Sequence, residues 1–575
     1  MQEIREQLKN IIKDLYDLDF EPDFSPSPEN LDTDYSTNAP LKLAKLLHKP
    51  PLVIAEELKN KIDANISAPG FLNFKLSNDY LTKAIDNLAT NFDASIHSDN
   101  YKGQTVICEF SDPNPFKVLH VGHLYTSIVG DSISRLFEYA GAKVIRANFG
   151  GDVGLHVAKT MYILQQKDTS SLKIEDIANC YIEGTAAYED DENARQEITQ
   201  LNKEIYQINA AGKDVIDGST WTDDAAGGTP AERNRELGET AAAEPVQKLA
   251  NLYWRARELS YEYFKDFYAK IGVKFDKYYP ESTVAPLGLK TVKDQLEKGV
   301  YEYSDGAVIF NGEKFGLHTR VFINKEGVPT YETKDVGLIF TKWQDYHFDK
   351  SVVITGNEQL DYMKVVLKSV EQYAPDLVKK TTHLTHGLVK LPGGVKMSSR
   401  KGNFLKAVDV LDLVNSALKE EFDSTDPVIS LAATKYAFLK YKMGGNIIFD
   451  PHDSVKMTGN SGPYLLYSAV RAKKILSNPR NKTPIKDYIY NIHEKSLAKK
   501  LLEYHSILDE AVSDLAPHKL ASYLYELSQS FSRFYEHCPV VGSPEESERL
   551  KLVNIYLNVM THGLNLLGIT IPEEM

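Results

Sequence analysis

Two histidines lie three residues apart at the point where a predicted strand is followed by a predicted helix. His120 and His123 bracket Val121 and Gly122 in SDPNPFKVLHVGHLY, which follows the apolar run TVICEF. Free backbone N–H groups and the helix dipole favour an anion there, and a glycine lets a ligand approach the backbone closely. Imidazoles beside that position can donate hydrogen bonds to a phosphate whose charge grows during a reaction. The pair therefore predicts a phosphate site; the alternative is a pair of capping or metal-binding histidines.

A second cluster suited to phosphate lies in LPGGVKMSSRKGNF at residues 391–404. Lys396, Arg400 and Lys401 lie among small residues that make the loop mobile and bring backbone donors close to a ligand. These cations suit a triphosphate that must be neutralised as pyrophosphate departs. The segment is not a Walker A loop, since G-x-x-x-x-G-K-[ST] is absent. A solvated basic loop is the alternative.

The segments around the two histidines have the pattern of strand, loop, helix and strand. Residues 105–110 and 143–149 are the predicted strands, and Gly141 suits the C-terminal end of the helix between them. The helix is predicted from apolar residues at helical spacing, which are Leu124, Ile128, Ile133, Leu136 and Phe137. Such a βαβ unit predicts a parallel sheet with a ligand crevice at the strand ends.

The rest of the chain predicts further domains, since 575 residues are too many for one core. We expect an N-terminal α+β domain over residues 1–100, an α/β domain with a Rossmann-like parallel sheet over residues 101–425, and an all-α helical bundle over residues 426–575. Within the second domain, residues 166–245 are interpreted as a polar, acidic insertion. Its middle, rich in small residues, is expected to be a surface excursion and partly flexible.

Two apolar stripes are the basis for predicting helices near the two ends of the chain. The N-terminal stripe consists of Ile4, Leu8, Ile11 and Leu15. The C-terminal stripe repeats at spacings of 4, 3, 4 and 3 and consists of Leu520, Leu524, Leu527, Phe531 and Phe534. The C-terminal stripe is interpreted as bundle core rather than a cofactor site.

Composition excludes some classes of protein and leaves others open. No run of 18 or more apolar residues occurs, so no membrane span is expected, and an acidic N-terminus without an apolar core favours a cytoplasmic protein. Cys108, Cys180 and Cys538 are isolated in sequence, so neither a disulfide framework nor a structural zinc site is expected. The formal net charge of -14 does not exclude nucleic acid, because a local basic surface holds a polyanion.

The HVGH and KMSSRKG segments together resemble the HIGH and KMSKS elements of class I aminoacyl-tRNA synthetases. The resemblance narrows to arginyl-tRNA synthetases and covers nearly the whole chain. The segments that carry it are DYSTNAPLKLAK, PGFLNF, EFSDPNPFKVLHVGH, GVPTYETKDVG, TGNEQ, LASYLYELSQSFSRFYEHCPV and GLNLLGITIPEEM.

This resemblance implies an arginine–tRNA ligase. Such an enzyme activates L-arginine with ATP to arginyl-adenylate and transfers arginine to the 3′-terminal adenosine of tRNA(Arg), with no covalent protein nucleophile. Mg²⁺ is expected to ride on the ATP. Members of the family usually activate arginine only with tRNA bound, and a monomer is the family expectation. The N-terminal domain is implied to touch the tRNA elbow and the C-terminal bundle to read the anticodon loop.

The resemblance also assigns roles to individual residues. The residues implied in catalysis are Lys117, His120, His123, Lys396 and Lys401. The residues implied in ATP binding are Lys117, His120, Gly122, His123, Met397, Ser398 and Ser399. The residues implied in arginine binding are Glu109, Asn114, His120, Tyr331, Asp335 and Gln359, with no metal site. Carboxylates at 109 and 335 would hold the guanidinium by bidentate, charge-assisted pairs. For Asp335, a helix N-terminal acid is the alternative.

Two departures from the pattern of class I enzymes stand out. The second lysine of KMSKS falls on Ser399, and Lys117 resembles the lysine that many arginine enzymes place upstream to compensate. Where relatives often have an aromatic residue in GDWG, this chain has Val153, which puts a stacking role there in doubt.

Two rival functions remain to be weighed. A class I synthetase for another amino acid is disfavoured by Glu109 and Asp335, since an uncharged side chain would leave two buried carboxylates unpaired. A catalytically silent tRNA-binding paralogue is disfavoured by the intact HVGH and KMSSRKG segments.

Overall fold

The computed structural model describes residues 2–27, 33–212, 244–392, 405–477, 479 and 483–575. The chain divides into two compact units. The first contains Met1–His97, Ser468–Asp509 and Tyr523–His562, and the second contains Ser98–Tyr467, Glu510–Ser522 and Gly563–Met575. Each unit is described by itself.

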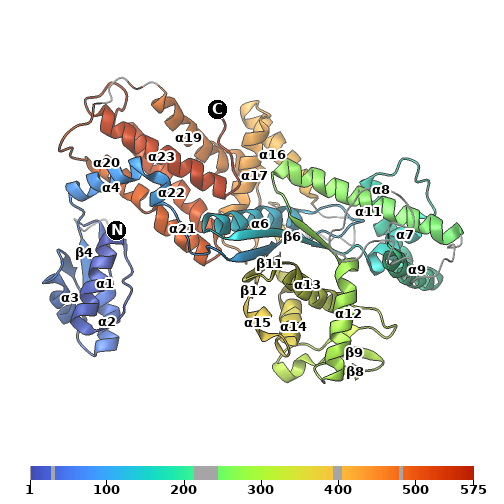
Figure 1. Ribbon diagram of the computed structural model, residues 1–575. Helices are drawn as coiled ribbons and strands as arrows, with labels where there is room; N and C mark the ends of the chain where they lie inside the picture. The colour runs from blue at the N-terminus through green and yellow to red at the C-terminus, as the bar shows by residue number, and fades with distance from the viewer. Residues whose placement is uncertain (1, 28–32, 213–243, 393–404, 478, 480–482) are drawn as a thin grey trace. The chain divides into compact units, whose positions relative to one another are not determined.

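A five-stranded sheet forms the centre of the second unit (Figure 1). Its strands are β5 (Thr105–Glu109), β6 (Lys143–Gly150), β7 (Lys277–Pro280), β11 (Lys350–Gly356) and β12 (Thr381–His386). Their order is β12-β11-β5-β6-β7, and all four pairs are parallel. The chain runs outward from β5 to β6 and β7 and then returns to β11 on the other side of β5. The order therefore reverses at β5 and β11, which is where α/β sheets bind ligands.

The predicted βαβ unit is confirmed as β5, α6 (Val121–Tyr139) and β6. The five apolar residues that predicted the helix are at most 2% exposed, which are Leu124, Ile128, Ile133, Leu136 and Phe137. Gly141, with φ of +88°, follows the helix end at Ala140, as a C-terminal glycine does. The helix begins earlier than the apolar spacing indicated, because His120 caps it.

The polar, acidic insertion over residues 166–245 contains two helices that the sequence analysis did not predict. These are α8 (Ile174–Asp190) and α9 (Glu192–Ala211), which pack with α7 (Leu155–Leu164) and α11 (Glu244–Ile271) around one apolar cluster. Ile177, Ile198 and Ile205 are fully buried there. Their helical spacing is masked in the sequence by the many acidic residues around them. The middle of the insertion, residues 213–243, lies outside the described residues.

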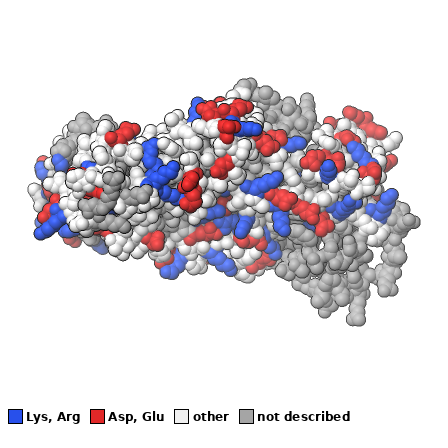
Figure 2. All heavy atoms as spheres, turned by 90° about the horizontal axis from the view of Figure 1, so that it is seen from above, with Lys and Arg blue, Asp and Glu red and all other residues white. Residues whose placement is uncertain are grey.

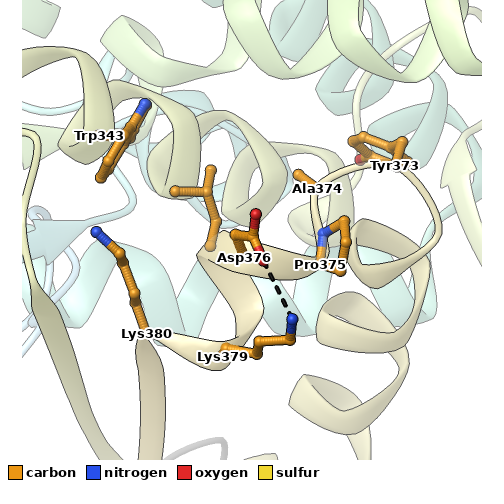
Figure 3. A pocket seen from close by; sticks show the side chains of 8 residues that line it. Trp343, Tyr373, Ala374, Pro375, Asp376, Lys379 and Lys380 are labelled. Atoms are coloured by element: carbon orange, nitrogen blue, oxygen red, sulfur yellow. Dashed lines mark hydrogen bonds and ion pairs between the residues drawn. The ribbon is translucent and has the colours of Figure 1, made fainter.

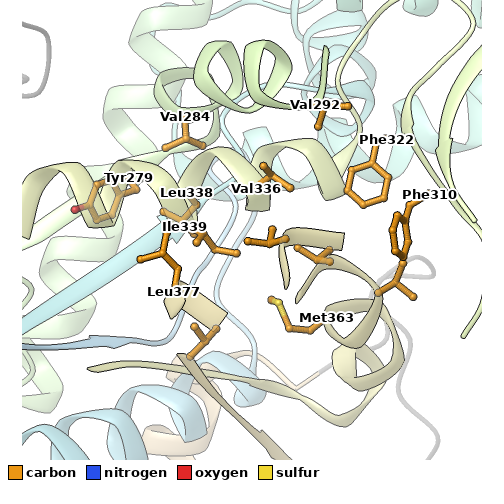
Figure 4. Packing of buried hydrophobic residues seen from close by; sticks show 14 of the residues in the cluster. Tyr279, Val284, Val292, Phe310, Phe322, Val336, Leu338, Ile339, Met363 and Leu377 are labelled. Carbon is orange, nitrogen blue, oxygen red and sulfur yellow. The ribbon is translucent and has the colours of Figure 1, made fainter. Parts of the chain in front are cut away.

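Two helices on one side of the sheet pack at very short range. They are α12 (Glu281–Glu297) and α13 (Tyr331–Tyr346), and they share a core with Ile107 and Val353 of the sheet (Figure 4). A Cβ atom at Gly288 would lie 2.0 Å from Thr333 O, and one at Gly337 would lie 2.1 Å from Val284 O. The contact therefore requires glycine at both positions, and it fixes the N-terminal turn of α13 beside the sheet.

The remaining elements of this unit complete its outer layers. A three-stranded antiparallel sheet consists of β8 (Glu302–Ser304), β9 (Ala307–Phe310) and β10 (Arg320–Ile323). The other elements are η2 (Gly312–Phe315), η3 (Asn357–Gln359), α14 (Leu360–Glu371), α15 (Pro375–Lys379), β13 (Val389–Lys390), α16 (Ala407–Phe422), α17 (Pro427–Leu439), β14 (Ile447–Ile448) and α18 (Pro451–Val455).

The first unit begins with an α+β fold, as predicted. Its antiparallel sheet has the order β1-β2-β4-β3, with β1 (Ser25–Pro26), β2 (Tyr35–Thr37), β3 (Asn65–Ser67) and β4 (Phe71–Phe74). Its helices are α1 (Gln2–Tyr16), α2 (Ala39–Leu47), α3 (Pro51–Lys59), α4 (Asn78–Thr90) and α5 (Phe92–Ser95). The predicted apolar face of α1 is wrong at one end: Leu15 is 39% exposed, whereas Leu8 and Ile12 are fully buried. The apolar cluster of this domain contains Leu8 and Ile12, with Ile4 and Ile11 packed against it, and it does not include Leu15.

The C-terminal region is helical, as predicted. Its helices are α19 (Gly462–Leu476), α20 (Ile492–Leu502), α21 (Tyr504–Ser513), α22 (Pro517–His537) and α23 (Glu546–Leu566). The stripe predicted as bundle core is fully buried, and it consists of Leu520, Leu524, Leu527, Phe531 and Phe534.

Three general surface and composition features complete the description. Basic and acidic side chains are interspersed on the face shown in Figure 2. None of the described helices is both long and apolar enough to cross a membrane. Cys108, Cys180 and Cys538 are buried free thiols.

Candidate active site

The loop that connects β5 to α6 is held in a strained conformation. Ser111, Asp112 and Phe116 have φ of +73°, +49° and +68°, a region that non-glycine residues rarely occupy. Side chains from this loop bond the end of β6: Asp112 Oδ1 accepts from Phe149 N at 2.8 Å, and Asn114 Oδ1 accepts from Gly151 N at 2.8 Å. These bonds fix the loop that carries the predicted site residues.

The two histidines cap α6 with the same ring nitrogen. His120 Nδ1 accepts from Gly122 N, and His123 Nδ1 accepts from His120 N, both at 3.1 Å. Their rings stack with centroids 3.8 Å apart. Because Nδ1 is an acceptor in both, each neutral ring carries its proton on Nε2. The capping alternative is therefore correct for Nδ1, and it leaves the donor role to Nε2.

Both histidines are neutral near pH 7. Burial lowers the pKa of His120 to about 4, with smaller contributions from His386 and Lys117. Burial also lowers the pKa of His123 well below its usual value, and His120 and Lys117 lower it further. The pair thus offers N–H donors without carrying positive charge.

Lys117 lies beside the inserted helix α8. Its Nζ is 4.2 Å from the centroid of the Tyr181 ring, a cation–π contact. Lys117 also lowers the pKa of His120, His123 and His156. The structure thus places this cation near the N-terminus of α6.

Two of the buried carboxylates near the sheet edge are already neutralised by lysines. Glu109 Oε2 accepts from Lys342 Nζ at 2.5 Å, and both side chains are at most 3% exposed. Glu281, at the first position of α12, pairs with buried Lys334 of α13. Removing either lysine would leave a buried charge uncompensated, which is strongly destabilising.

Asp335 differs from these acids. Its Oδ2 accepts from the Tyr362 hydroxyl, and among the residues the structure describes it has no ion-pair partner. Burial, reinforced by the charges of Glu109 and Glu281, raises its pKa to about 8 despite the Tyr362 bond. The pKa of Asp112 is also raised well above its usual value, by burial and then by Glu109. Among the described residues, Asp335 and Asp112 are thus two buried carboxyl groups that no lysine or arginine neutralises through an ion pair.

The other predicted arginine-binding residues lie at the ends of nearby elements. Tyr331 begins α13, is 51% exposed, and its hydroxyl lies 3.4 Å from His156 Nδ1. Gln359 is exposed and ends η3, directly after β11. Tyr331 and Asp335 are four residues apart in one helix, and such residues share a face.

The KMSSRKG segment lies outside the part of the chain that the structure describes. Lys396, Met397, Ser398, Ser399 and Lys401 lie outside the described residues. The chain immediately after them runs beside the histidine loop. Val121 N donates to Leu405 O at 2.9 Å, and Ala407 N donates to Leu119 O at 2.9 Å.

The two middle residues of GDVG, Asp152 and Val153, are buried in the fold. Asp152 is fully buried and accepts from Ser282 N at 2.9 Å, Ser282 Oγ at 2.7 Å and Arg257 Nε at 3.0 Å. Val153 is also fully buried, in the cluster that contains Phe116. The residue that takes the place of the family's aromatic one is thus a core residue.

Sequence reasoning missed five residues of this site. They are His156, Glu281, Lys334, Lys342 and Tyr362. His156 follows GDVG closely, Lys334 lies inside GVPTYETKDVG next to Asp335, and Tyr362 comes three residues after TGNEQ, so the sequence offered a signal for these three. Glu281 and Lys342 lie outside the motifs, and only the fold brings them to Lys334 and Glu109.

A separate hollow lies where Trp343, Tyr373, Pro375 and neighbouring residues meet (Figure 3). Lys380 Nζ lies 4.7 Å from the Trp343 ring, and Lys379 pairs with Asp376 at 3.1 Å. None of the predicted site residues lines this hollow.

The sheet order and the histidine-capped helix define a Rossmann-like nucleotide-binding domain. Three family models match the chain. The catalytic domain of "tRNA synthetases class I (R)" matches residues 86–221 and 240–437, the "Arginyl tRNA synthetase N terminal domain" matches residues 2–76, and the "DALR anticodon binding domain" matches residues 465–575. The chain therefore belongs to the class I tRNA synthetase family of the arginine type, which confirms the family, fold class and enzyme class predicted from the sequence.

Curated relatives agree over the whole length. An arginine–tRNA ligase of Flavobacterium psychrophilum is 27% identical and covers 100% of both chains. One from Fusobacterium nucleatum is 28% identical over 94% of this chain and 93% of its own. Among solved structures, the arginyl-tRNA synthetase of Thermus thermophilus has a TM-score of 0.78 at 22% identity, over 100% of both chains. That of Plasmodium falciparum has a TM-score of 0.75 at 21% identity, over 100% of this chain and 99% of its own. The two structures support the fold.

Proposed function

We propose that this arginine–tRNA ligase activates L-arginine with ATP at the C-terminal ends of β5 and β11. The observation that carries the proposal is the state of Asp335. It is a buried carboxylate without a cation among the described residues, beside two carboxylates, Glu109 and Glu281, that each have a lysine. A substrate that brings its own delocalised cation completes this arrangement.

Arginine fits the site better than lysine or an uncharged amino acid. The planar guanidinium makes two parallel bonds to one carboxylate, which an ammonium cannot copy. An uncharged side chain would leave Asp335 to be neutralised by a proton instead. We assign Asp335 as the principal guanidinium partner. Lys342 bonds Oε2 of Glu109, so a direct role of Glu109 in arginine binding uses its other oxygen.

The remaining arginine-binding residues have complementary tasks. Asn114 has its Oδ1 engaged by Gly151 N, so its amide N–H groups are the part that suits the substrate carboxylate. Tyr331 and Gln359 lie at the starts of α13 and α14 and are proposed to line the same site. His120 is proposed to contact both arginine and ATP.

ATP phosphates are proposed to bind at the N-terminus of α6. Neutral His120 and His123 would donate from Nε2, and the backbone of Gly122 would allow close approach. Lys117 would contact the phosphates in place of the lysine that the family pattern has where this chain has Ser399. The 396–401 segment would draw pyrophosphate away, and its neighbour Leu405 is bonded to Val121. Mg²⁺ would arrive bound to ATP.

The reaction then takes place in two displacements. An oxygen of the arginine carboxylate attacks the α-phosphorus of ATP, and the bond to pyrophosphate breaks. A ribose hydroxyl of the terminal adenosine attacks the carbonyl carbon of the arginyl-adenylate, and AMP leaves. Positioning and electrostatic stabilisation account for catalysis, without a protein nucleophile.

The tRNA is proposed to contact the parts of the chain outside the catalytic domain. Residues 1–100 would bind the elbow and residues 426–575 the anticodon loop. The anticodon-binding model that matches residues 465–575 supports the second assignment. Arg471, Lys473 and Lys474 on α19 are candidates for phosphate contacts. A cytoplasmic monomer is the form we propose.

The test is ATP–pyrophosphate exchange with arginine, run with and without total tRNA and with lysine as a control. We expect exchange with arginine but not with lysine, and only when tRNA is present. Exchange without tRNA would support the arginine-activating activity and contradict its dependence on tRNA. No exchange from folded protein that still binds tRNA would favour the silent tRNA-binding paralogue.

A further inference from the structure

A chain of three hydrogen bonds connects two of the proposed arginine-binding residues. Gly151 N donates to Asn114 Oδ1 at 2.8 Å. The carbonyl of the same glycine lies 2.7 Å from His156 Nε2, and His156 Nδ1 lies 3.4 Å from the Tyr331 hydroxyl. The backbone of Gly151 and the imidazole of His156 thus join the β5–α6 loop to the start of α13.

The direction of every bond in this chain follows from its chemistry. His156 is 7% exposed, and burial followed by the charge of Lys117 lowers its pKa well below the usual value, so the ring is neutral. The carbonyl of Gly151 can only accept, so Nε2 carries the proton. Nδ1 is then an acceptor, and the Tyr331 hydroxyl must donate to it.

This directionality determines what each end presents to a substrate. The Tyr331 hydroxyl donates its proton to His156, so its oxygen can only accept a hydrogen bond from a substrate. A guanidinium is a pure donor and suits an acceptor. At the other end, Asn114 has its oxygen engaged and presents N–H donors, which suit a carboxylate. The chain of hydrogen bonds therefore makes Tyr331 an acceptor and Asn114 a donor toward the substrate. These roles match the guanidinium and the carboxylate ends of arginine.

Gly151 is restricted by the same arrangement. A Cβ atom there would lie 2.6 Å from Asn114 Oδ1 and 3.0 Å from Glu281 Oε1. Any side chain would push Asn114 away from the backbone N–H that orients it. The close approach explains why this link between Asn114 and His156 is made by a glycine.

We propose that His156 is a positioning residue for arginine binding, which orients Tyr331 as an acceptor and connects it through Gly151 to Asn114. This inference rests on the proposed function, since it names a residue that prepares the same site. His156 acts through Tyr331 and Gly151 and not by touching the reacting atoms.

Two substitutions of His156 test the proposal by steady-state aminoacylation, with KM measured separately for arginine, ATP and tRNA. His156→Leu removes both bonds at similar volume, and we expect KM for arginine to rise about tenfold, as loss of an oriented hydrogen bond predicts. KM for ATP should be unchanged. His156→Gln keeps a donor and an acceptor and should stay within about threefold of wild type.

The coupling to Tyr331 is tested by a double-mutant cycle. Tyr331→Phe removes the hydroxyl that His156 orients, so adding His156→Leu should raise KM for arginine by much less than it does alone. Full additivity of the two changes, or an unaltered KM for arginine in His156→Leu, would overturn the proposal. If His156→Leu does not fold, His156→Asn carries the same expectation, because its shorter amide cannot reach both partners.

A matched control exists in the other unit. The Tyr504 hydroxyl and His562 Nδ1 are 2.6 Å apart, the same kind of tyrosine–histidine bond as the one at Tyr331. His562→Leu should lower Tm and leave KM for arginine unchanged. Wild-type protein that fails to use arginine would overturn the proposed function. Active wild-type protein with His156→Leu behaving like His562→Leu would overturn this inference alone.

Discussion

The hydroxyl of Tyr362 donates a hydrogen bond to Oδ2 of Asp335, across the gap between α14 and α13. This bond favours the ionised carboxylate, yet burial outweighs it, and the pKa of Asp335 is raised to about 8. The group is thus held close to its ionisation point at physiological pH. Asp335 must lose its proton before it can pair with a guanidinium. The affinity of the site for arginine should therefore depend on pH.

Arginine affinity should rise with pH and then become constant. Below pH 8 the free site holds a proton on Asp335 that arginine displaces, so KM for arginine should fall as pH rises toward about 8. Initial rates over a range of pH values measure this dependence. Asp335→Asn should bind arginine weakly, with a much flatter pH dependence. An unchanged pH dependence in that variant would remove Asp335 from guanidinium binding.

Asp335 should also make stability depend on pH. Its folded pKa is about 8, above the ordinary pKa of 3.8 for this carboxyl group, so the folded state binds the extra proton between these values. The unfolded state binds fewer protons there, and the contribution of Asp335 to stability therefore falls as pH rises from about 4 to about 8. In the absence of arginine, the Tm of Asp335→Asn relative to wild type should increase from pH 6 to pH 8. A difference that does not vary with pH would contradict the raised pKa.

Lys117→Ala should reduce turnover strongly and leave arginine binding nearly unchanged. The lysine lies near His120 and His123 at the N-terminus of α6, as its effects on their pKa values indicate, and it is not among the causes that shift the pKa of Asp335. Loss of a group that stabilises the transition state lowers kcat and kcat/KM together. Single-turnover adenylate formation measures the effect. Near-normal turnover would exclude Lys117 from the mechanism.

Tyr181 should hold Lys117 in place through the face of its ring. The 4.2 Å contact comes from α8, in the insertion over residues 166–245. Tyr181→Leu removes the ring face and should weaken ATP use severalfold, whereas Tyr181→Phe keeps it and should remain close to wild type. The comparison is made by KM and kcat for ATP. Equal effects of the two substitutions would point to the hydroxyl or to packing instead.

Gly337→Ala should destabilise the catalytic unit. A methyl group at this position would lie 2.1 Å from Val284 O, so α12 and α13 would have to separate. Overpacking of this kind costs about 1–3 kcal/mol, occasionally more. Gly445→Ala, with no atom within 4 Å of the added carbon, is the control. Thermal unfolding compares the two, and equal Tm values would contradict the tight helix contact.

The local structure of the proposed phosphate site could be predicted from the sequence. HVGH and the apolar spacing that follows it specify a capped helix after a strand, because capping and helical periodicity depend on residues within a few positions of one another. The two-histidine site, the parallel sheet and the C-terminal bundle were predicted on that basis. The face of α1 was placed wrongly at Leu15, since several stripes of a short amphipathic helix are compatible with its spacing and only the packing partner selects one.

Family resemblance proposed roles for Glu109, Asn114, Tyr331, Asp335 and Gln359, but the state of these groups depended on the fold. Whether a buried acid is neutralised is decided by residues far away in the chain: Lys342 for Glu109, and Tyr362 without a described cation for Asp335. Such pairings depend on distances in space, which local spacing does not encode. The sequence by itself thus determined the motifs, several of the helices and the family, whereas only the tertiary structure decided which buried carboxylate lacks a described cation and how Gly151, His156 and Tyr331 are hydrogen-bonded.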